Sequence, residues 1–208
     1  MFDFNAESGS IRVYGVIGPY EDGIDEVDFM RAFDDLGGDD VTIHLQSEGG
    51  SVTSGLSIYN QIQNYPGKVT VKIDALAASI ASVFPMAADR VIANPTSTVM
   101  VHDPWAAAIG NAADFRSTAD VLDKLADDIA GTYAERTGKA SAYWRDVMAR
   151  EVYFSASQAK AEGLVDEIAG KASGTTRKAA AAATMSPAMA KLKTKVAAQR
   201  LKLRRMNG

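Results

Sequence analysis

The chain has 208 residues, of which 47% are hydrophobic and 23% charged, a balance typical of one water-soluble domain with its own core. It contains no cysteine, which excludes disulfides, thiolate metal sites and a cysteine nucleophile, and its two histidines leave little material for a zinc site. No apolar stretch approaches the roughly 18 residues that a membrane span needs, and the N-terminus lacks the pattern of a secretory signal. We therefore expect a cytoplasmic protein without a metal or another cofactor.

Charge is distributed unevenly along the chain. Residues 171–208 hold ten Lys or Arg and no Asp or Glu, whereas the remainder holds 12 basic and 26 acidic side chains. This shift predicts a domain over residues 1–170 and a basic, Ala-rich tail over residues 171–208, consisting of a linker and an amphipathic helix. Such a composition is common in disordered termini, and its charges also suit salt-sensitive, nonspecific binding of nucleic acid.

The hydrophobic periodicity predicts strands that alternate with helices. In the first helix, residues 25–36, the three-residue spacing places the apolar face on Val27, Met30, Phe33 and Leu36. Repeated strand, helix, strand order predicts an α/β fold with a mostly parallel sheet and right-handed crossovers. We expect strands at residues 11–17, 41–45, 69–73, 91–93, 98–102 and 151–154, and helices at 25–36, 51–64, 79–88, 112–137, 141–149 and 155–162.

Two of the predicted helices carry further signals. Over residues 112–137, Phe115, Leu122 and Ile129 recur every seven residues and form a long apolar stripe. That stripe needs a partner surface, which is either the core of the same domain or a second subunit. In the last helix, Ser155 and Gln158 form the pattern of a capping box, with Gly163 at the C-terminal end.

A serine and a histidine provide the parts of a nucleophilic site. Ser79 follows a predicted strand and begins a predicted helix, where it is either an ordinary N-cap or a hydroxyl placed at the positive end of the helix dipole. A serine needs a base within hydrogen-bond reach to become a nucleophile. His102 ends an apolar strand and is the candidate base, whereas His44 lies in the middle of a strand and is interpreted as structural.

A glycine turn provides the third part. Gly49 and Gly50 lie between a strand and a helix, where free backbone N–H groups bind anions. The Gly-Lys-Ser or Gly-Lys-Thr of a phosphate loop does not follow, and plain turn formation is the other alternative. A helix-start serine, a strand-end histidine and a glycine turn together are what acyl transfer requires.

At this point the chain resembles the Clp protease proteolytic-subunit family, within the wider crotonase-like fold, over about residues 11–168. The resemblance implies that Ser79 is the nucleophile, that His102 is the general base and that the backbone N–H groups of Gly50 and Ile80 form the oxyanion hole. It also implies protein or peptide substrates and a homo-oligomer of rings that meet through the helix 112–137. The motifs that carry it are Gly49-Gly50-Ser51-Val52, Gly55-Leu56-Ser57-Ile58-Tyr59, Ala77-Ala78-Ser79, Met100-Val101-His102 and Phe154-Ser155-Ala156 with Gly163-Leu164-Val165-Asp166.

The orienting acid of the family's triad has no clear counterpart. The family's aspartate position corresponds to Val152, which cannot orient an imidazole. Glu151 and Asp103 are candidates, but in an extended segment neighbouring side chains point to opposite faces. The site is therefore a Ser-His dyad, unless a bulge or a register slip turns Glu151 inward.

Two further features of the sequence resemble those of one branch of this family. We expect the chain to start almost directly on its first strand and therefore to lack the longer N-terminal segment with which housekeeping members engage an ATP-driven unfoldase. Together with the basic tail, this resembles the head-maturation proteases of tailed phages, which cleave scaffold and capsid proteins. The resemblance implies a serine endopeptidase that acts without an ATPase partner, in the bacterial host cytoplasm or the assembling prohead.

Three other functions remain as alternatives. A catalytically silent scaffold or assembly protein of the same fold is suggested by Val152. A crotonase-type acyl-thioester enzyme would use the same paired N–H groups for an enolate and would not need Ser79. A serine–lysine peptidase is disfavoured, because Lys68 and Lys72 lie at the far end of the strand from Ser79.

Overall fold

The computed structural model describes residues 2–5, 9–21 and 23–170. The chain divides into two compact units, one of Met1–Ala106 and Gly110–Gly170 and the other of Ala107–Ile109 and Lys171–Gly208. Of the second unit only residues 107–109 are described, as an irregular segment. The predicted basic tail lies outside the described residues, and its boundary and helix stay predictions.

In the described part of the chain, eight strands form one sheet with the order β1-β2-β3-β4-β5-β8, and β6 pairs with both β4 and β7. Only the pairs β1–β2 and β6–β7 are antiparallel. This mostly parallel sheet with intervening helices confirms the predicted α/β fold class. The strands are β1 (Phe2–Asn5), β2 (Ser10–Ile17), β3 (Val41–Gly50), β4 (Val69–Ala78), β5 (Arg90–Ala93), β6 (Thr98–Val101), β7 (Val152–Ser155) and β8 (Glu167–Ile168).

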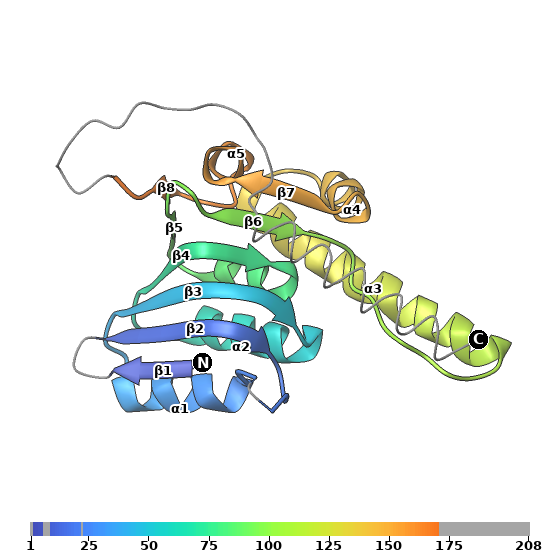
Figure 1. Cartoon of the computed structure of the whole chain (residues 1–208), viewed down its shortest axis with the longest axis horizontal. Coiled ribbons are helices and arrows are strands. Elements are labelled where there is room, and N and C mark those ends of the chain that lie inside the picture. The colour runs from blue at the N-terminus through green and yellow to red at the C-terminus, as the bar shows by residue number, and fades with distance from the viewer. Residues whose placement is uncertain (1, 6–8, 22, 171–208) are drawn as a thin grey trace. The chain divides into compact units, whose positions relative to one another are not determined.

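Helices α1 and α2 lie on one face of the sheet (Figure 1). Along β2, β3 and β4, alternate side chains such as Ile11, Ile43 and Val71 are fully buried in the core beneath these helices. The opposite face of the same strands is polar and partly exposed. The helices are α1 (Glu26–Leu36), α2 (Val52–Asn64), α3 (Ala112–Thr137), α4 (Ser141–Ala149) and α5 (Ala156–Glu162), and two short 3₁₀ helices are η1 (Ser79–Ser82) and η2 (Phe84–Ala87).

The predicted apolar face of α1 is partly wrong. Val27 and Met30 are exposed, whereas Phe29 and Ala32 are buried together with Phe33. A strict three-residue spacing drifts around a helix of 3.6 residues per turn, so the true core face follows the i, i+3, i+4, i+7 pattern from Phe29 to Leu36.

The predicted helix over residues 79–88 is also wrong. The segment forms two 3₁₀ turns, η1 and η2, instead of one α-helix. An α-helix would need a hydrogen bond from the backbone N of Pro85 to the carbonyl of Ala81, and proline has no N–H to give. The argument that Ser79 sits on the macrodipole of a regular helix therefore fails, although the first N–H groups of η1 still lack intrahelical acceptors.

Helix α3 is buried along only part of its length. Ala126, Ile129 and Tyr133 in its second half belong to the core, whereas Phe115 and Val121 in its first half are 52% and 56% exposed. The apolar stripe is therefore shared between the core and a surface, and Figure 1 shows the first turns of α3 extending beyond the sheet. Neither α3 nor any other helix in the described part is both long and apolar enough to cross a membrane.

Candidate active site

Ser79 and His102 lie side by side at the ends of two adjacent parallel strands. Strands β4 and β6 pair up to Ala78 and Met100, and the chain continues directly into Ser79 on one side and Val101–His102 on the other. The Nε2 atom of His102 lies 2.7 Å from the Oγ atom of Ser79. This is hydrogen-bond distance, so the imidazole is placed to take the hydroxyl proton.

The backbone at Ser79 is strained. Its φ angle is +58°, in the left-handed region, where placing any residue other than glycine costs about 1–2 kcal/mol. Ala78, not Ser79, occupies the N-cap position of η1, and no side chain makes a capping hydrogen bond there. The interpretation of Ser79 as an ordinary helix cap is therefore wrong, and strain of this kind concentrates at functional sites.

The predicted glycine turn is instead the end of strand β3, which continues through Gly50, and Gly49 lies directly against Ser79. Gly49 has a φ angle of +93°, and a Cβ atom built there would approach the Cβ of Ser79 to 2.6 Å and the carbonyl oxygen of Ala78 to 2.7 Å. A Cβ on Gly50 would lie only 2.0 Å from the carbonyl oxygen of Ile17. Glycine at position 49 therefore lets the backbone approach the serine, and glycine at position 50 lets it approach the neighbouring strand β2 at Ile17.

Ser47 shapes the glycine turn, a role that the sequence did not indicate. Its hydroxyl donates to the carbonyl of Gly15 at 2.6 Å and accepts the N–H of Gly49 at 3.0 Å. The side chain is 2% exposed. The only signal in the sequence is a serine two residues before a Gly-Gly pair, a pattern too common to indicate this role.

The register of β6 and β7 selects a candidate acid for the imidazole. These strands are antiparallel, with Val101 opposite Val152, so the next position places Glu151 opposite His102. Glu151 precedes β7 and has a φ angle of +52°, so it is not part of the extended segment. The expectation that Glu151 must point away from the site assumed an extended backbone and does not apply. The hydroxyl of Tyr153 lies 3.2 Å from its Oε1 atom and donates to it.

Asp103, the other candidate acid, is engaged elsewhere. Its carboxylate pairs with the guanidinium of Arg145 at 3.4 Å, and the same guanidinium contacts Asp123 and Asp127 on α3. The backbone N–H of Asp103 donates to the carbonyl of Met148. The carboxylate is therefore directed toward α3 and α4.

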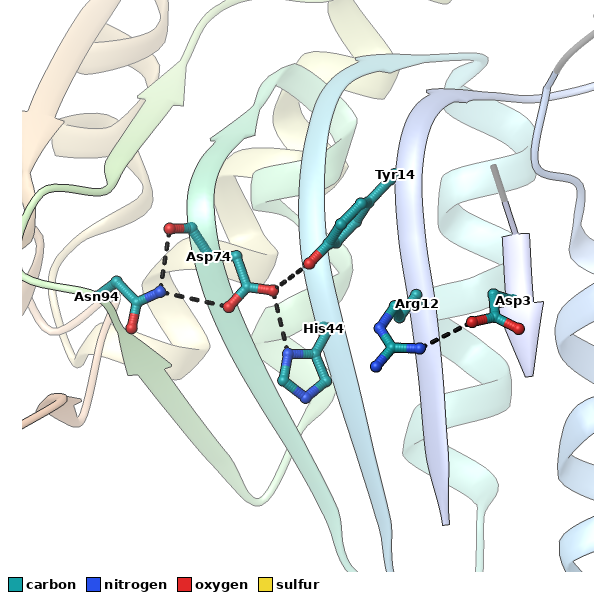
Figure 2. Close-up of polar contacts among 6 residues, drawn as sticks. All are labelled: Asp3, Arg12, Tyr14, His44, Asp74 and Asn94. Carbon is teal, nitrogen blue, oxygen red and sulfur yellow. Dashed lines mark hydrogen bonds and ion pairs between the residues drawn. The ribbon is translucent and has the colours of Figure 1, made fainter. Parts of the chain in front are cut away.

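The second histidine, His44, belongs to a polar cluster on the open face of the sheet (Figure 2). The Oδ2 atom of Asp74 accepts hydrogen bonds from the Tyr14 hydroxyl at 2.6 Å and from Nδ1 of His44 at 3.0 Å. Asn94 donates to the same carboxylate, and its hydrogen bond to the Asp74 backbone carbonyl completes the cluster. The hydrogen bond to Asp74, together with burial, raises the pKa of the Tyr14 phenol.

This cluster is separate from Ser79. His44 pairs with Lys72 in the β3–β4 register, and Lys72 lies seven residues before Ser79, roughly 20 Å along the strand. Among the described residues, no three His, Cys, Asp or Glu side chains form a group that could hold a metal ion.

Comparison with known proteins identifies the family. The sequence profile described as Clp protease matches residues 32–172. The chain belongs to the Clp protease family. It is 35% identical over 134 residues to the ATP-dependent Clp protease proteolytic subunit of Bacteroides fragilis, covering 63% of this chain and 64% of that protein. A subunit of the same name from Chlorella vulgaris is 35% identical over 129 residues, covering 61% of this chain and 64% of that protein.

The fold comparison agrees with the sequence comparison. A solved mutant of ClpP1 from Listeria monocytogenes matches with a TM-score of 0.71 at 23% identity, covering 80% of this chain and 94% of that one. At this identity the likeness is one of fold. The chain spans less than two thirds of the length of the curated relatives it matches.

Proposed function

We propose that this member of the Clp protease family is a serine endopeptidase that cleaves protein substrates through an acyl-enzyme. The observation that carries the proposal is the 2.7 Å approach of His102 Nε2 to the hydroxyl of Ser79. The strained backbone at Ser79 and the contact with Gly49 support it. A serine, an adjacent base and nearby backbone N–H groups, which we propose to be those of Gly50 and Ile80, are the parts of an acyl-transfer site.

The first half of the reaction forms an ester on Ser79. The Oγ atom attacks the carbonyl carbon of the peptide bond while Nε2 of His102 takes its proton. The negative charge that develops on the carbonyl oxygen is stabilised by the backbone N–H groups of Gly50 and Ile80. When the intermediate collapses, the C–N bond breaks, and the leaving amine takes the proton from His102.

The second half releases the product. A water molecule gives a proton to His102 and attacks the ester carbonyl, and the same two N–H groups stabilise the second oxyanion. The C–Oγ bond then breaks, the proton returns from His102 to Ser79, and a free carboxylic acid leaves. No step needs a metal ion or another co-reactant.

We propose Glu151 as the residue that orients His102. Glu151 and His102 directly adjoin the paired residues Val152 and Val101, and this proximity, the left-handed backbone of Glu151 and the hydrogen bond from Tyr153 support this role over Asp103. A carboxylate in this role holds the tautomer with the proton on Nδ1 and stabilises the imidazolium that forms during the reaction. Val152, one residue later, packs against the core instead.

The same proposal includes the assembly and the substrates. The exposed Phe115 and Val121 on α3 support a homo-oligomer in which this helix contacts a second subunit, a contact that sedimentation of wild type and Phe115→Ser can test. The resemblance to phage head-maturation proteases supports scaffold and capsid proteins as substrates and cleavage without a partner ATPase. Cleavage of an unfolded protein in the absence of nucleotide tests the latter directly.

The central test uses an alkyl fluorophosphonate probe, which modifies activated serines. Wild type is expected to be labelled at Ser79 and to hydrolyse unfolded protein, and Ser79→Ala is expected to lose both signals. Ser57→Ala, a serine on α2, serves as the matched control. A folded wild type without labelling or hydrolysis would overturn the proposal and favour a silent scaffold. Hydrolysis that survives in Ser79→Ala would exclude Ser79 as the nucleophile.

A further inference from the structure

A buried pair of hydroxyls lies directly behind Ser79. The Oγ atom of Ser82 lies 2.6 Å from the backbone carbonyl oxygen of Ser79 and 3.0 Å from that of Met100. The hydroxyl of Tyr133, from α3, lies 2.7 Å from the same Oγ. Both side chains are buried, with 0% exposure at Ser82 and 1% at Tyr133.

The direction of these hydrogen bonds follows from counting protons. The two carbonyl oxygens can only accept, so the single proton of Ser82 must point toward them. The Tyr133 hydroxyl therefore donates to Ser82, which is also the sole partner of that phenol among the described residues. Burial raises the pKa of Tyr133, so the phenol keeps its proton at any physiological pH. The result is a directed chain from Tyr133 to Ser82 and on to the two carbonyls.

The two carbonyls belong to the two segments that form the active site. One is the carbonyl of Ser79 itself, the residue with the strained backbone. The other belongs to Met100, two residues before His102 on β6. The β4–β6 ladder ends at Ala78 and Met100, so Ser82 supplies a hydrogen bond just beyond the last paired residues.

A purely local role does not explain this arrangement. A helical serine often bonds to the carbonyl three residues before it, and the contact with Ser79 alone would be such a case. The contacts with Met100 and Tyr133 are tertiary, and they join η1 to β6 and α3. Tyr133 is itself fixed by Trp144, whose ring centroid lies 5.1 Å away.

We propose that Ser82 and Tyr133 are positioning residues that hold the Ser79 hydroxyl at the reactive distance from His102. The inference rests on the proposed peptidase function and extends it to two residues that do not touch the substrate. Ser82 fixes the carbonyl of the strained Ser79 peptide against the strand that carries His102, and Tyr133 fixes the orientation of Ser82. Nucleophilic attack is sensitive to such placement, since a shift of about 1 Å can cost 100-fold in rate.

The test compares Ser82→Ala, Tyr133→Phe and the double variant with wild type. Ser82→Ala leaves the buried phenol of Tyr133 without an acceptor and is expected to lose stability, whereas the double variant removes that phenol and is expected to regain it. For reaction with the fluorophosphonate and for kcat we expect a fall of about 10- to 100-fold in Ser82→Ala and in the double variant, with KM little changed. Tyr133→Phe alone keeps the bond from Ser82 to the carbonyls and is expected to lose less, about threefold to tenfold.

Two matched controls separate placement from general damage to the core. Ser97→Ala removes a buried hydroxyl that has no hydrogen-bond partner among the described residues, and Tyr65→Phe removes a phenol that donates to the carbonyl of Asp39. Both are expected to react with the probe at the wild-type rate. Hydrogen exchange is expected to quicken at residues 79–83 and 100–102 in Ser82→Ala and in the double variant, but not in the controls.

Each outcome decides one of the two proposals. If labelling recovers together with stability in the double variant, or never falls in Ser82→Ala, the positioning role is wrong and the peptidase proposal stands. A wild type that is not labelled overturns the peptidase proposal instead. In that case hydrogen exchange decides the inference: unchanged exchange in Ser82→Ala excludes it, and faster exchange at both segments shows that the pair holds them together.

Discussion

The two histidines of this chain have opposite surroundings. His102 directly follows strand β6 and lies beside the hydroxyl of Ser79, whose backbone is strained and packs against Gly49. His44 lies in the middle of β3, where Asp74 holds its Nδ1 atom and also binds the hydroxyl of Tyr14. His44 therefore has an orienting carboxylate without an activated nucleophile beside it. An oriented imidazole becomes a catalytic base only where the backbone places a hydroxyl or another proton-bearing nucleophile beside it.

Removing each histidine gives the sharpest form of this comparison. His102→Ala is expected to lower kcat/KM for an unfolded protein substrate by at least about 1,000-fold, because Ser79 loses its base. His44→Ala is expected to leave kcat/KM unchanged and to affect only stability. Initial rates together with melting temperatures measure both effects. Equal losses of activity from the two variants would show that the polar cluster takes part in the reaction.

The two candidate acids for His102, Glu151 and Asp103, provide the next comparison. Glu151→Gln keeps the size of the side chain but removes its charge, and we expect kcat to fall by about 100- to 10,000-fold. Asp103→Asn is the matched variant and is expected to have a much smaller effect, because its carboxylate pairs with Arg145. The pH profile of kcat/KM is the second measurement. A large loss of kcat in Asp103→Asn alone would show that Asp103, and not Glu151, orients His102. If neither variant loses activity, the site is a Ser-His dyad.

Most of the strands and helices, and the approach of Ser79 to His102, could be predicted from the sequence, because they depend on local signals. Alternating hydrophobic residues marked the strands, and the capping box of Ser155 and Gln158 is present in the structure, with Gly163 in a left-handed conformation at the C-terminal end. The end of a parallel strand is where a functional side chain is expected, and both Ser79 and His102 lie there.

The rest of the site depends on tertiary structure and could not be predicted. The left-handed backbone at Glu151 departs from the extended conformation that was expected there, and nothing in the sequence around residue 151 signals it. Ser82 and Tyr133 are 51 positions apart in the chain, and only the packing of α3 against η1 brings them together. The same applies to α1. The three-residue pattern predicted that Val27 and Met30 are buried, whereas the residues buried in the structure include Phe29 and Ala32.

Within the polar cluster of His44, a neutral amide in place of the carboxylate tests whether the cluster serves stability alone. Asp74→Asn leaves one acceptor oxygen for the three donors Tyr14, His44 and Asn94, and we expect it to lower the free energy of unfolding by about 1–2 kcal/mol. Activity at a temperature well below the melting point is expected to stay at the wild-type level. Asp3→Asn, which removes an exposed ion pair with Arg12, is the control and is expected to change little. Loss of activity in stable Asp74→Asn would connect the two histidine sites.

The smallest expected effect concerns an ion pair far from both histidines, between Lys139 and Glu162. Burial raises the pKa of the Glu162 carboxyl, but hydrogen bonds from Lys139 and Tyr143 outweigh it and hold the pKa below its ordinary value. A carboxyl whose pKa is lowered by folding stabilises the folded state at pH values above its ordinary pKa. This stabilisation disappears as the pH falls through the pKa of the carboxyl in the folded state. The side chains of Lys139 and Glu162 are 34% and 23% exposed to solvent. Screening by solvent therefore limits the contribution of this ion pair to the free energy of unfolding to about 0.5–1 kcal/mol.

Lys139→Met is accordingly expected to lower the melting temperature by about 1–4 °C at pH 7, and its difference from wild type is expected to disappear once the pH has fallen below the folded-state pKa of Glu162. Lys160→Met, at an exposed position on α5, is the matched control and is expected to show no such pH dependence. Because Lys139 and Glu162 contact neither Ser79 nor His102, peptidase activity is expected to stay constant in both variants at pH 7. A difference between Lys139→Met and wild type that does not shrink as the pH is lowered would mean that the lysine stabilises the fold through packing on Tyr143 and not through the carboxylate. The Nζ atom of Lys139 lies 4.7 Å from the centroid of that ring.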